Sequence, residues 1–205
     1  MKLVDLTHTF TASIPVFPGD PKPSLEQVAF IEKDSFNDHK ISTVMHVGTH
    51  MDAPLHMIAG GKTIDELPPE KFVGKGILID VRGKDVIDSS VLDGVTITKD
   101  AIVLLYTGFA KKYGEESYYT KCPSIAEDFA KKMVDLKIKL LGMDMAGPDP
   151  DAPWPVHKIL LGNDIYILED LCNLAALVSS KAFEVMALPA KIQSDAAPVR
   201  VIARV

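Results

Sequence analysis

Eleven residues, HVGTHMDAPLH at positions 46–56, constrain this chain more than any other stretch, because they hold three of its six histidines and an aspartate. Imidazole and carboxylate groups bind zinc-like and manganese-like ions when they converge on one point. The intervening VGT, with its β-branched residues and glycine, favours a strand end or a loop over a helix. The glycine lets the backbone bend so that two imidazoles can meet one ion, and Pro54 stiffens the exit. The stretch therefore predicts a metal site formed by His46, His50 and Asp52.

The same stretch also predicts a proton carrier beside the metal. An ion held by three protein ligands keeps open positions for water, and it can lower the pKa of that water to about 7. His56 suits general acid/base work, since an imidazole has an unperturbed pKa of about 6.5. Spacing alone leaves His56 open between ligation and proton transfer. A hydrogen-bonded polar loop is the alternative for the whole stretch, but such a loop has no need of four metal-capable groups.

The composition is that of an ordinary globular protein. With 205 residues, 47% of them apolar and 24% charged, the chain fits one domain over residues 1–205. A net charge of -6, without a stripe of lysine and arginine, predicts no nucleic-acid partner. The longest apolar runs are too short to cross a bilayer, and the N-terminal MKLVDLTHTF lacks the apolar core of a secretory signal. We therefore expect no membrane association and a cytoplasmic location.

Strand patterns outnumber helix patterns along the chain. Residues 15–23 hold four prolines and should form a rigid loop, whereas residues 123–137 give the clearest helix, with Ser124 as N-cap and Glu127 completing a capping box. Nine segments have strand patterns: residues 2–8, 29–32, 40–46, 74–83, 101–108, 139–145, 165–168, 183–188 and 199–205. Interleaved strands and helices indicate an α/β fold. Because many strands follow one another without a helix, we expect a mixed, strand-rich sheet.

A second cluster of candidate ligands lies far down the chain. His157 follows Pro155 at the start of an expected short helix, where proline favours the first turn. Glu169 follows the expected strand at residues 165–168. Taken singly, each residue is typical of a polar surface position. The two matter for the metal site only if the fold brings them to residues 46–56.

The stretch at residues 46–56 resembles the HxGTHxDxPxH signature of the cyclase-like metal-dependent hydrolases, a family with bacterial kynurenine formamidases (arylformamidases) and isatin hydrolases. The resemblance covers nearly the whole chain. Its other pieces are VDLTH, PVFPGD, YTGF, APWPVH, EDLCNL, ALPAKI and PVRVIA, at residues 4–8, 15–20, 106–109, 152–157, 169–174, 187–192 and 198–203. The eleven-residue signature is specific, and the order and spacing of the later pieces agree with it.

The resemblance implies a swivelling β/β/α domain with one or two ions of zinc or manganese. His46, His50 and Asp52 would bind one ion, and Asp52 would bridge to a second ion completed by His157 and Glu169. A metal-activated hydroxide would be the nucleophile and His56 the catalytic acid/base. The family also implies a homodimer or homotetramer whose N-terminal segments lend residues to a neighbouring site.

The implied reaction is hydrolysis of a C–N amide bond in a small molecule, with N-formylkynurenine from tryptophan catabolism as the leading substrate. Phe17 stands in the N-terminal loop where formamidases often carry tryptophan or tyrosine, and its ring can stack on a substrate. The first alternative is a hydrolase of cyclic amides such as isatin-like lactams, or a cyclase. The second is a non-catalytic protein with a structural metal site. Structural zinc sites are usually closed by four ligands, often cysteines, and Cys122 and Cys172 are remote from the motif.

Overall fold

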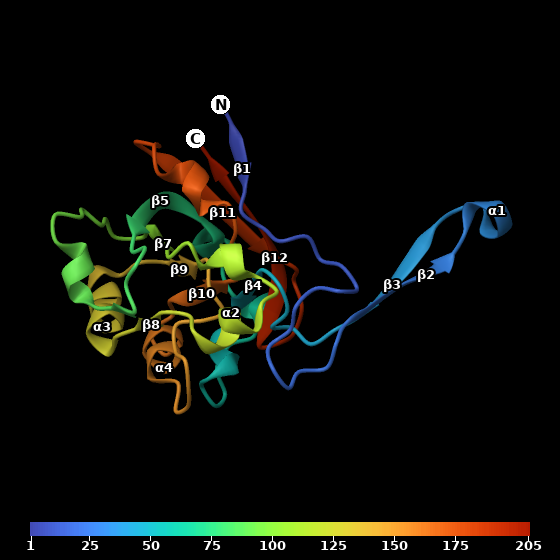
Figure 1. The fold of residues 1–205 in the computed structure, drawn as a ribbon, viewed down its shortest axis with the longest axis horizontal. Coiled ribbons are helices and arrows are strands. Elements are labelled where there is room, and N and C mark those ends of the chain that lie inside the picture. Colours follow the sequence, from blue (N-terminus) through green and yellow to red (C-terminus); the bar gives the residue numbers. More distant parts are fainter.

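Seven strands close into a barrel-like sheet in the computed structural model, which describes all residues from 1 to 205 (Figure 1). The order around the ring is β12, β11, β5, β7, β9, β10 and β4, and β4 pairs again with β12. These strands are β4 (His50–Asp52), β5 (Val73–Asp80), β7 (Ile102–Tyr106), β9 (Leu140–Met143), β10 (Tyr166–Glu169), β11 (Phe183–Pro189) and β12 (Ala196–Arg204). One edge of the long strand β12 pairs with β11, and its other edge pairs with β4 and then with β1 (Leu3–Asp5).

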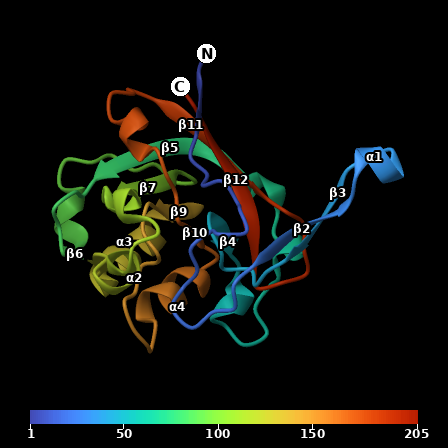
Figure 2. The ribbon, with the colours of Figure 1, turned by 45° about the vertical axis from the view of Figure 1, so that its right-hand side comes forward.

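The sheet is mixed, as the sequence predicts. The successive neighbours β5, β7, β9 and β10 are parallel, whereas β4, β11, β12 and β1 pair antiparallel. Helix α3 (Glu127–Leu136) connects β7 to β9, and helix α4 (Pro155–Leu161) connects β9 to β10, because parallel neighbours need a crossover connection. The two helices pack against each other on the outer face of the sheet (Figure 2).

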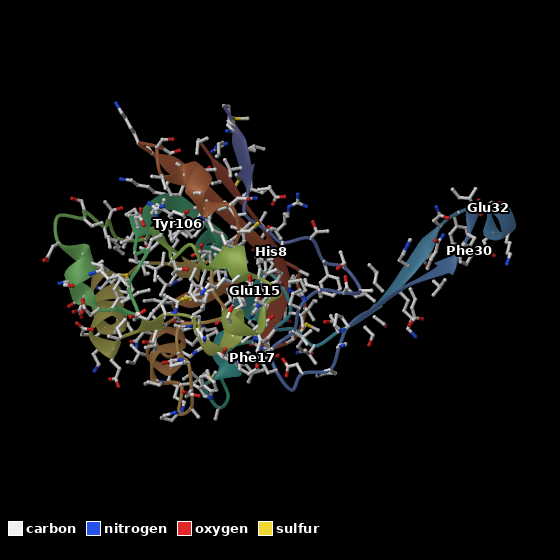
Figure 3. The ribbon with its side chains drawn as sticks, viewed as in Figure 1. His8, Phe17, Phe30, Glu32, Tyr106 and Glu115 are labelled. Atoms are coloured by element: carbon white, nitrogen blue, oxygen red, sulfur yellow. The ribbon has the colours of Figure 1, made fainter.

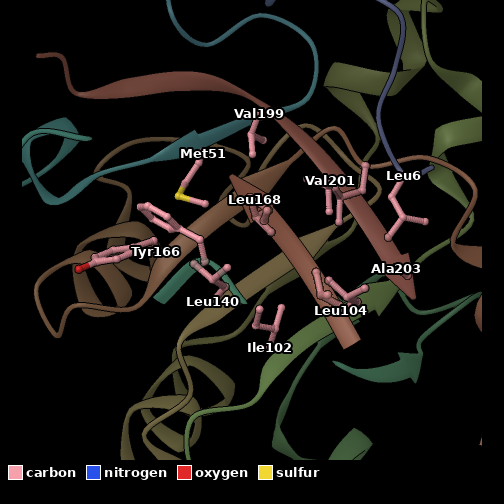
Figure 4. Close-up of a cluster of buried hydrophobic side chains, with 14 of the residues drawn as sticks. Leu6, Met51, Ile102, Leu104, Leu140, Tyr166, Leu168, Val199, Val201 and Ala203 are labelled. Atoms are coloured by element: carbon pink, nitrogen blue, oxygen red, sulfur yellow. The ribbon is translucent and has the colours of Figure 1, made fainter. Parts of the chain in front are cut away.

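Strand β7 is buried on both faces, which explains its unbroken apolar sequence IVLLY. Ile102 and Leu104 point into the barrel, where they join a cluster of 23 buried residues (Figure 4). Val103 and Leu105 point the other way and pack beneath α3 and α4 in a second cluster of 18 buried residues. The alternation of side chains along a strand therefore supplies two cores, one inside the barrel and one under the helices.

A hairpin arm projects from the body of the molecule (Figures 1 and 2). Strands β2 (Ser24–Ala29) and β3 (Asp38–Ser42) pair with each other alone, and α1 (Ile31–Asp34) forms the tip between them. The remaining short elements are β6 (Val86–Ile87), β8 (Ser124–Ile125), α2 (Glu116–Thr120) and 3-10 turns at Pro54–His56, Ile64–Glu66, Pro69–Phe72, Ser89–Leu92, Phe109–Lys112 and Leu174–Leu177. None of the helices has the length and apolar character required to span a bilayer.

Eight of the nine predicted strands exist, seven of them with both ends within three residues of the prediction, and the strand predicted at residues 29–32 is wrong. Residues 29–32 straddle the end of β2 and the start of α1, because the chain turns there at the tip of the arm. The strand predicted at residues 40–46 is β3, but it begins at Asp38 and ends at Ser42, so it does not reach His46. Residues 43–46 instead carry the chain back from the arm to the body.

The predicted helix at residues 123–137 exists, but its start is wrong. Ser124 is not the N-cap, because it pairs with Val86 in the short parallel ladder between β6 and β8. That pairing keeps the backbone of Ser124 extended, so the helix begins at Glu127 with Ala126 as its N-cap. A local capping pattern is overridden here by a pairing with a segment almost forty positions away.

Substitution of Leu104 by alanine should destabilise the fold strongly. Leu104 is fully buried at the centre of the sheet, and removing a buried leucine side chain costs about 2–5 kcal/mol. Leu188→Ala is the matched control, because the Leu188 side chain on β11 is 57% exposed. Denaturant unfolding should show a clear loss for Leu104→Ala and a change within about 0.5 kcal/mol for Leu188→Ala. Equal losses for both variants would contradict the description of the core.

Candidate metal centre

The site is built on β4, the three-residue strand that closes the barrel. His50 and Asp52 are two positions apart on this strand, so their side chains project from the same face of the sheet. Met51, between them, belongs to the cluster inside the barrel. His50 and Asp52 therefore face outwards, to the side that α4 covers. The neighbouring strand β10 places Glu169 directly opposite His50 in the antiparallel register.

Three histidines and two carboxylates from four segments of the chain come together. Oδ1 of Asp52 lies 3.0 Å from Nδ1 of His46 and 3.3 Å from Nε2 of His50. The carboxylate of Glu169 lies 3.4 Å from Nε2 of His50 and 3.2 Å from Nε2 of His157, which α4 supplies from its first turn. The structure thus brings together the two clusters that the sequence places more than one hundred residues apart.

The buried carboxylate of Asp52 provides the test of whether these residues fit a metal ion. Asp52 is fully buried, yet neither of its oxygens accepts a hydrogen bond of good geometry. Buried polar atoms without partners are rare because they cost free energy. The ring nitrogens of His46 and His50 lie 3.2 Å from each other and both face Oδ1 of Asp52. Nitrogen and oxygen donors that face one another in this way fit a shared divalent cation.

Each histidine of the cluster has an acceptor at its other ring nitrogen. Nε2 of His46 lies 2.9 Å from Oδ2 of Asp195, and Nδ1 of His157 lies 2.7 Å from Oδ2 of Asp149. Nδ1 of His50 lies 2.7 Å from the carbonyl oxygen of Gly48. Such contacts fix the tautomer and the orientation of a metal-binding imidazole, leaving the inward nitrogen free to ligate.

Sequence reasoning missed Asp149 and Asp195. Another buried aspartate, Asp144, has no such role, because its carboxylate accepts hydrogen bonds from Thr107 and Gly108. A signal for Asp149 does exist in its position before the helix. Its carboxylate accepts the backbone N–H groups of Val156 and His157 in the first turn of α4. No local signal marks Asp195, which lies 149 positions from His46.

His56 lies against the same centre, in the 3-10 turn Pro54–His56. Its ring centroid is 4.1 Å from that of His46, and its Nδ1 is 3.5 Å from Oδ2 of Asp195. Nitrogen atoms of His46 and His56 and an oxygen of Asp52 all lie within 4.8 Å of one another. A second group with the same spacing consists of His50, Asp52 and Glu169. The geometry therefore accommodates His56 either as a third donor or as a proton carrier beside the ions.

Burial and neighbouring charges shift the pKa values of the histidines in different directions. Burial alone would lower the pKa of His157, but the carboxylates of Asp149 and Glu169 raise it to about 10. Burial also opposes the charge on His50, and the contacts with Asp52 and Glu169 outweigh it and raise the pKa of His50 well above its usual value. For His56, burial dominates and lowers the pKa. His56 is therefore the histidine of this centre whose neutral form is favoured.

Four of the five candidate ligands, all but Asp52, line a cavity of about 300 Å³. His56 and the predicted substrate residue Phe17 line it too. Two further aromatic rings, Tyr119 and Trp154, form its walls. Phe17 and Tyr119 meet edge to face with ring centroids 5.8 Å apart. This volume lies at the lower end of small-molecule pockets, which suits a small aromatic molecule.

Two glycines allow the backbone to come close to this centre. Gly48 has φ +67°, and a Cβ atom there would meet Cδ1 of Ile14 at 2.6 Å. Gly147 has φ +141°, and a Cβ atom there would lie 3.0 Å from Oε1 of Glu169. Both positions favour glycine by conformation as well as by space. The bend expected at Gly48 from the sequence is thus confirmed.

Comparison with known proteins shows the family of this chain. The family model described as "Putative cyclase" matches residues 4–150. A kynurenine formamidase from Salinibacter ruber is 32% identical, and the match covers 100% of this chain and 98% of that protein. A kynurenine formamidase from Bacillus cereus is 30% identical, and the match covers 98% of this chain and 96% of that protein. Isatin hydrolase A from Labrenzia aggregata superposes with a TM-score of 0.88 at 27% identity, covering 98% of this chain and 93% of that chain. A solved structure described as a potential metal-dependent hydrolase with cyclase activity gives 0.81 at 28%, covering 98% and 96%. The chain belongs to the cyclase family of metal-dependent hydrolases.

Proposed function

We propose that this protein is a metal-dependent arylformamidase that hydrolyses the formamide bond of an N-formylated aromatic amine, with N-formylkynurenine as the leading substrate. The observation that carries the proposal is the convergence of two histidine–carboxylate groups on Asp52, beside a neutral His56 and an aromatic cavity. Full-length similarity to kynurenine formamidases supports the same reaction. Water adds to the formyl carbon, the C–N bond breaks, and formate and an arylamine leave.

The residues of the centre divide into two ligand sets that share one carboxylate. We assign His46, His50 and Asp52 to one divalent ion, and Asp52, His157 and Glu169 to a second. Such ions would polarise a carbonyl oxygen and lower the pKa of a water molecule. Imidazole and carboxylate donors suit zinc and manganese alike, and we propose zinc first. Because the ligand set opens onto the cavity, it differs from a structural site closed by four protein ligands.

His56 is assigned to proton transfer. Since burial lowers its pKa, its imidazole is neutral near pH 7 and can take a proton from the attacking water. The resulting imidazolium faces the Asp195 carboxylate across 3.5 Å, which stabilises its positive charge. His56 then delivers the proton to the amide nitrogen, which is a poor leaving group without it. Phe17, Tyr119 and Trp154 hold the aromatic ring of the substrate and exclude water from it.

A specific observation also favours hydrolysis of a cyclic amide. Isatin hydrolase A shares the fold at a TM-score of 0.88 and nearly full coverage. An isatin-like lactam is a compact bicyclic molecule, and the cavity of about 300 Å³ accommodates such a ring system as well as a formanilide. Lactam hydrolysis would use the same residues, because its step is again the addition of water to an amide carbonyl.

The arm supports a homodimer or a homotetramer. Apolar side chains are exposed along it, namely Leu25, Val28, Phe30, Ile31, Phe36 and Ile41, each at least 38% exposed. Figure 3 places Phe30 and Glu32 near the tip, far from Phe17 on the body. Exposed apolar patches of this kind mark protein interfaces. We propose that a second copy of this chain covers the arm, and that the assembly works in the cytoplasm.

Replacing Asp52 and His56 should separate metal binding from proton transfer. Asp52→Asn removes the shared carboxylate, so it should lose both zinc and formanilide hydrolysis. His56→Gln should keep the zinc and lower kcat about 10²- to 10⁴-fold, the range of general acid/base catalysis. Elemental analysis and steady-state kinetics measure the two effects. Loss of zinc from His56→Gln would instead identify His56 as a ligand, and full activity of Asp52→Asn would overturn the proposed centre.

A substrate panel should distinguish the two reactions. With zinc or manganese present, the wild-type protein should hydrolyse formanilide and N-formylkynurenine with a higher kcat/KM than isatin. Release of the arylamine from the formamides and opening of the isatin ring can be followed separately by absorbance. Turnover of isatin without turnover of either formamide would make the protein a lactam hydrolase.

Charging the tip of the arm should weaken the assembly. Phe30→Asp combined with Phe36→Asp places two carboxylates where apolar contact is expected, so the mass measured by light scattering should fall to that of one chain. Val86→Asp is the control, because Val86 is 52% exposed on the body of the molecule. A single-chain mass for the wild type, or an unchanged oligomer for the double variant, would contradict a role of the arm in assembly.

A further inference from the structure

The proline-rich loop places a carboxylate on the wall of the cavity. The backbone N–H of Asp20 donates to the carbonyl of Phe17 at 3.0 Å, across Pro18 and Gly19, whose φ is +102°. Proline followed by a residue of positive φ is the signature of a type II turn. The turn therefore fixes Phe17 and Asp20 at its two ends, and both line the cavity. Its closing hydrogen bond uses the backbone of Asp20 and leaves the carboxylate free.

Asp20 differs from the other carboxylates that line the same cavity. Asp149 and Glu169 contact His157, and Asp170 accepts a hydrogen bond from Tyr118 at 2.6 Å. The side chain of Asp20 makes no hydrogen bond and no ion pair within the chain, although it is partly buried. It is thus the one acidic group of the wall whose charge has no partner in the protein.

Lysine and arginine are missing from the wall of the cavity. Burial raises the pKa of the Tyr119 phenol most, and the nearby carboxylates of Asp170 and Asp20 raise it further. The walls thus offer a negative charge and aromatic faces, both of which attract cations. We propose that Asp20 is a specificity-determining residue that binds an ammonium group carried by the substrate, and that the cavity disfavours substrates whose only charge is a carboxylate at that end.

This inference rests on the proposed function, because it concerns the same cavity. It also predicts a preference for cationic substrates, which amide hydrolysis alone does not predict. Three formanilides serve as probes, carrying a methyl, an aminomethyl or a carboxylate group at the meta or para position. The wild-type protein should have a KM about fivefold lower for the aminomethyl probe than for the methyl probe, the upper end for a part-exposed ion pair. The carboxylate probe should have the highest KM of the three.

Asp20→Asn keeps the size of the side chain and removes its charge, so it should abolish the preference for the aminomethyl probe over the methyl probe. Asp151→Asn is the matched control, because Asp151 is an exposed residue of the loop that carries Trp154 and does not line the cavity. It should leave the ratio of the two KM values as in the wild type. The same ratio in Asp20→Asn and the wild type, or a wild-type preference for the carboxylate probe, would overturn the inference.

A binding measurement tests the role of Asp20 even if no formanilide is hydrolysed. Benzyltrimethylammonium carries a positive charge but has no lone pair for a metal ion, and benzyl alcohol is its neutral counterpart. Calorimetry should show benzyltrimethylammonium binding about fivefold more weakly to Asp20→Asn than to the wild type, with a smaller change for benzyl alcohol. Equal affinities of the cation for the two proteins would reject the role of Asp20. Absence of hydrolysis of every probe would reject the proposed function and leave this result standing.

Discussion

The pairing of the three-residue strand β4 with two partners holds the candidate site together. β10 pairs with one edge of β4 and β12 pairs with the other, so Asp52 lies opposite both Ile167 and Ala196. The backbone around His50 and Asp52 is therefore fixed from both sides, which short strands at a sheet edge do not achieve. The same pairing closes the barrel, and it also sets Glu169 beside His50 by register. A slip of one residue would turn both candidate ligands into the apolar interior.

The electrostatics of the centre follow from the short distance between its two buried carboxylates and the histidines. Asp52 and Glu169 are buried within reach of the same histidine. Burial raises the pKa of both carboxyl groups, and Asp52 raises that of Glu169 further, but the neighbouring imidazoles outweigh these effects and lower both pKa values. Two carboxylates so close in a medium of low polarity require positive charge, from protonated histidines or from metal ions. His50 and His157 have raised pKa values for this reason. Metal ions would release those protons, so the supporting contacts of Asp149 and Asp195 become important in fixing the tautomers.

Much of the fold and part of the site could be predicted from local sequence patterns. The strands β5 and β7 follow from their apolar runs. The convergence of His46, His50 and Asp52 follows from their spacing around a glycine, because a bend at glycine depends on local sequence alone. The local patterns were insufficient where long-range pairing decides the structure. Ser124 has the chemistry of an N-cap, but its pairing with Val86 keeps it in a strand.

The supporting groups of the site were harder to predict for the same reason. Asp195 reaches His46 only because β12 returns to β4, and nothing near Asp195 in the sequence marks that contact. Asp149 is one of three aspartates at residues 144–151, and only the geometry of the first turn of α4 identifies it as the supporting group. The histidines were conspicuous by type and spacing, whereas an aspartate is common and its role depends on what it faces.

The two halves of the cavity have different structural origins. Four of the five candidate ligands lie on barrel strands or on the first turn of α4, where a shift would disturb the core, and His46 precedes β4 across the bend at Gly48. Phe17 and Asp20 lie on a type II turn whose shape is set by Pro18 and Gly19 rather than by packing. Side chains at the ends of such a turn can change without moving its backbone, because the conformation depends on the two central residues. The chemistry of amide hydrolysis is therefore tied to the closure of the barrel, while the choice of substrate depends on a loop that can vary independently of it.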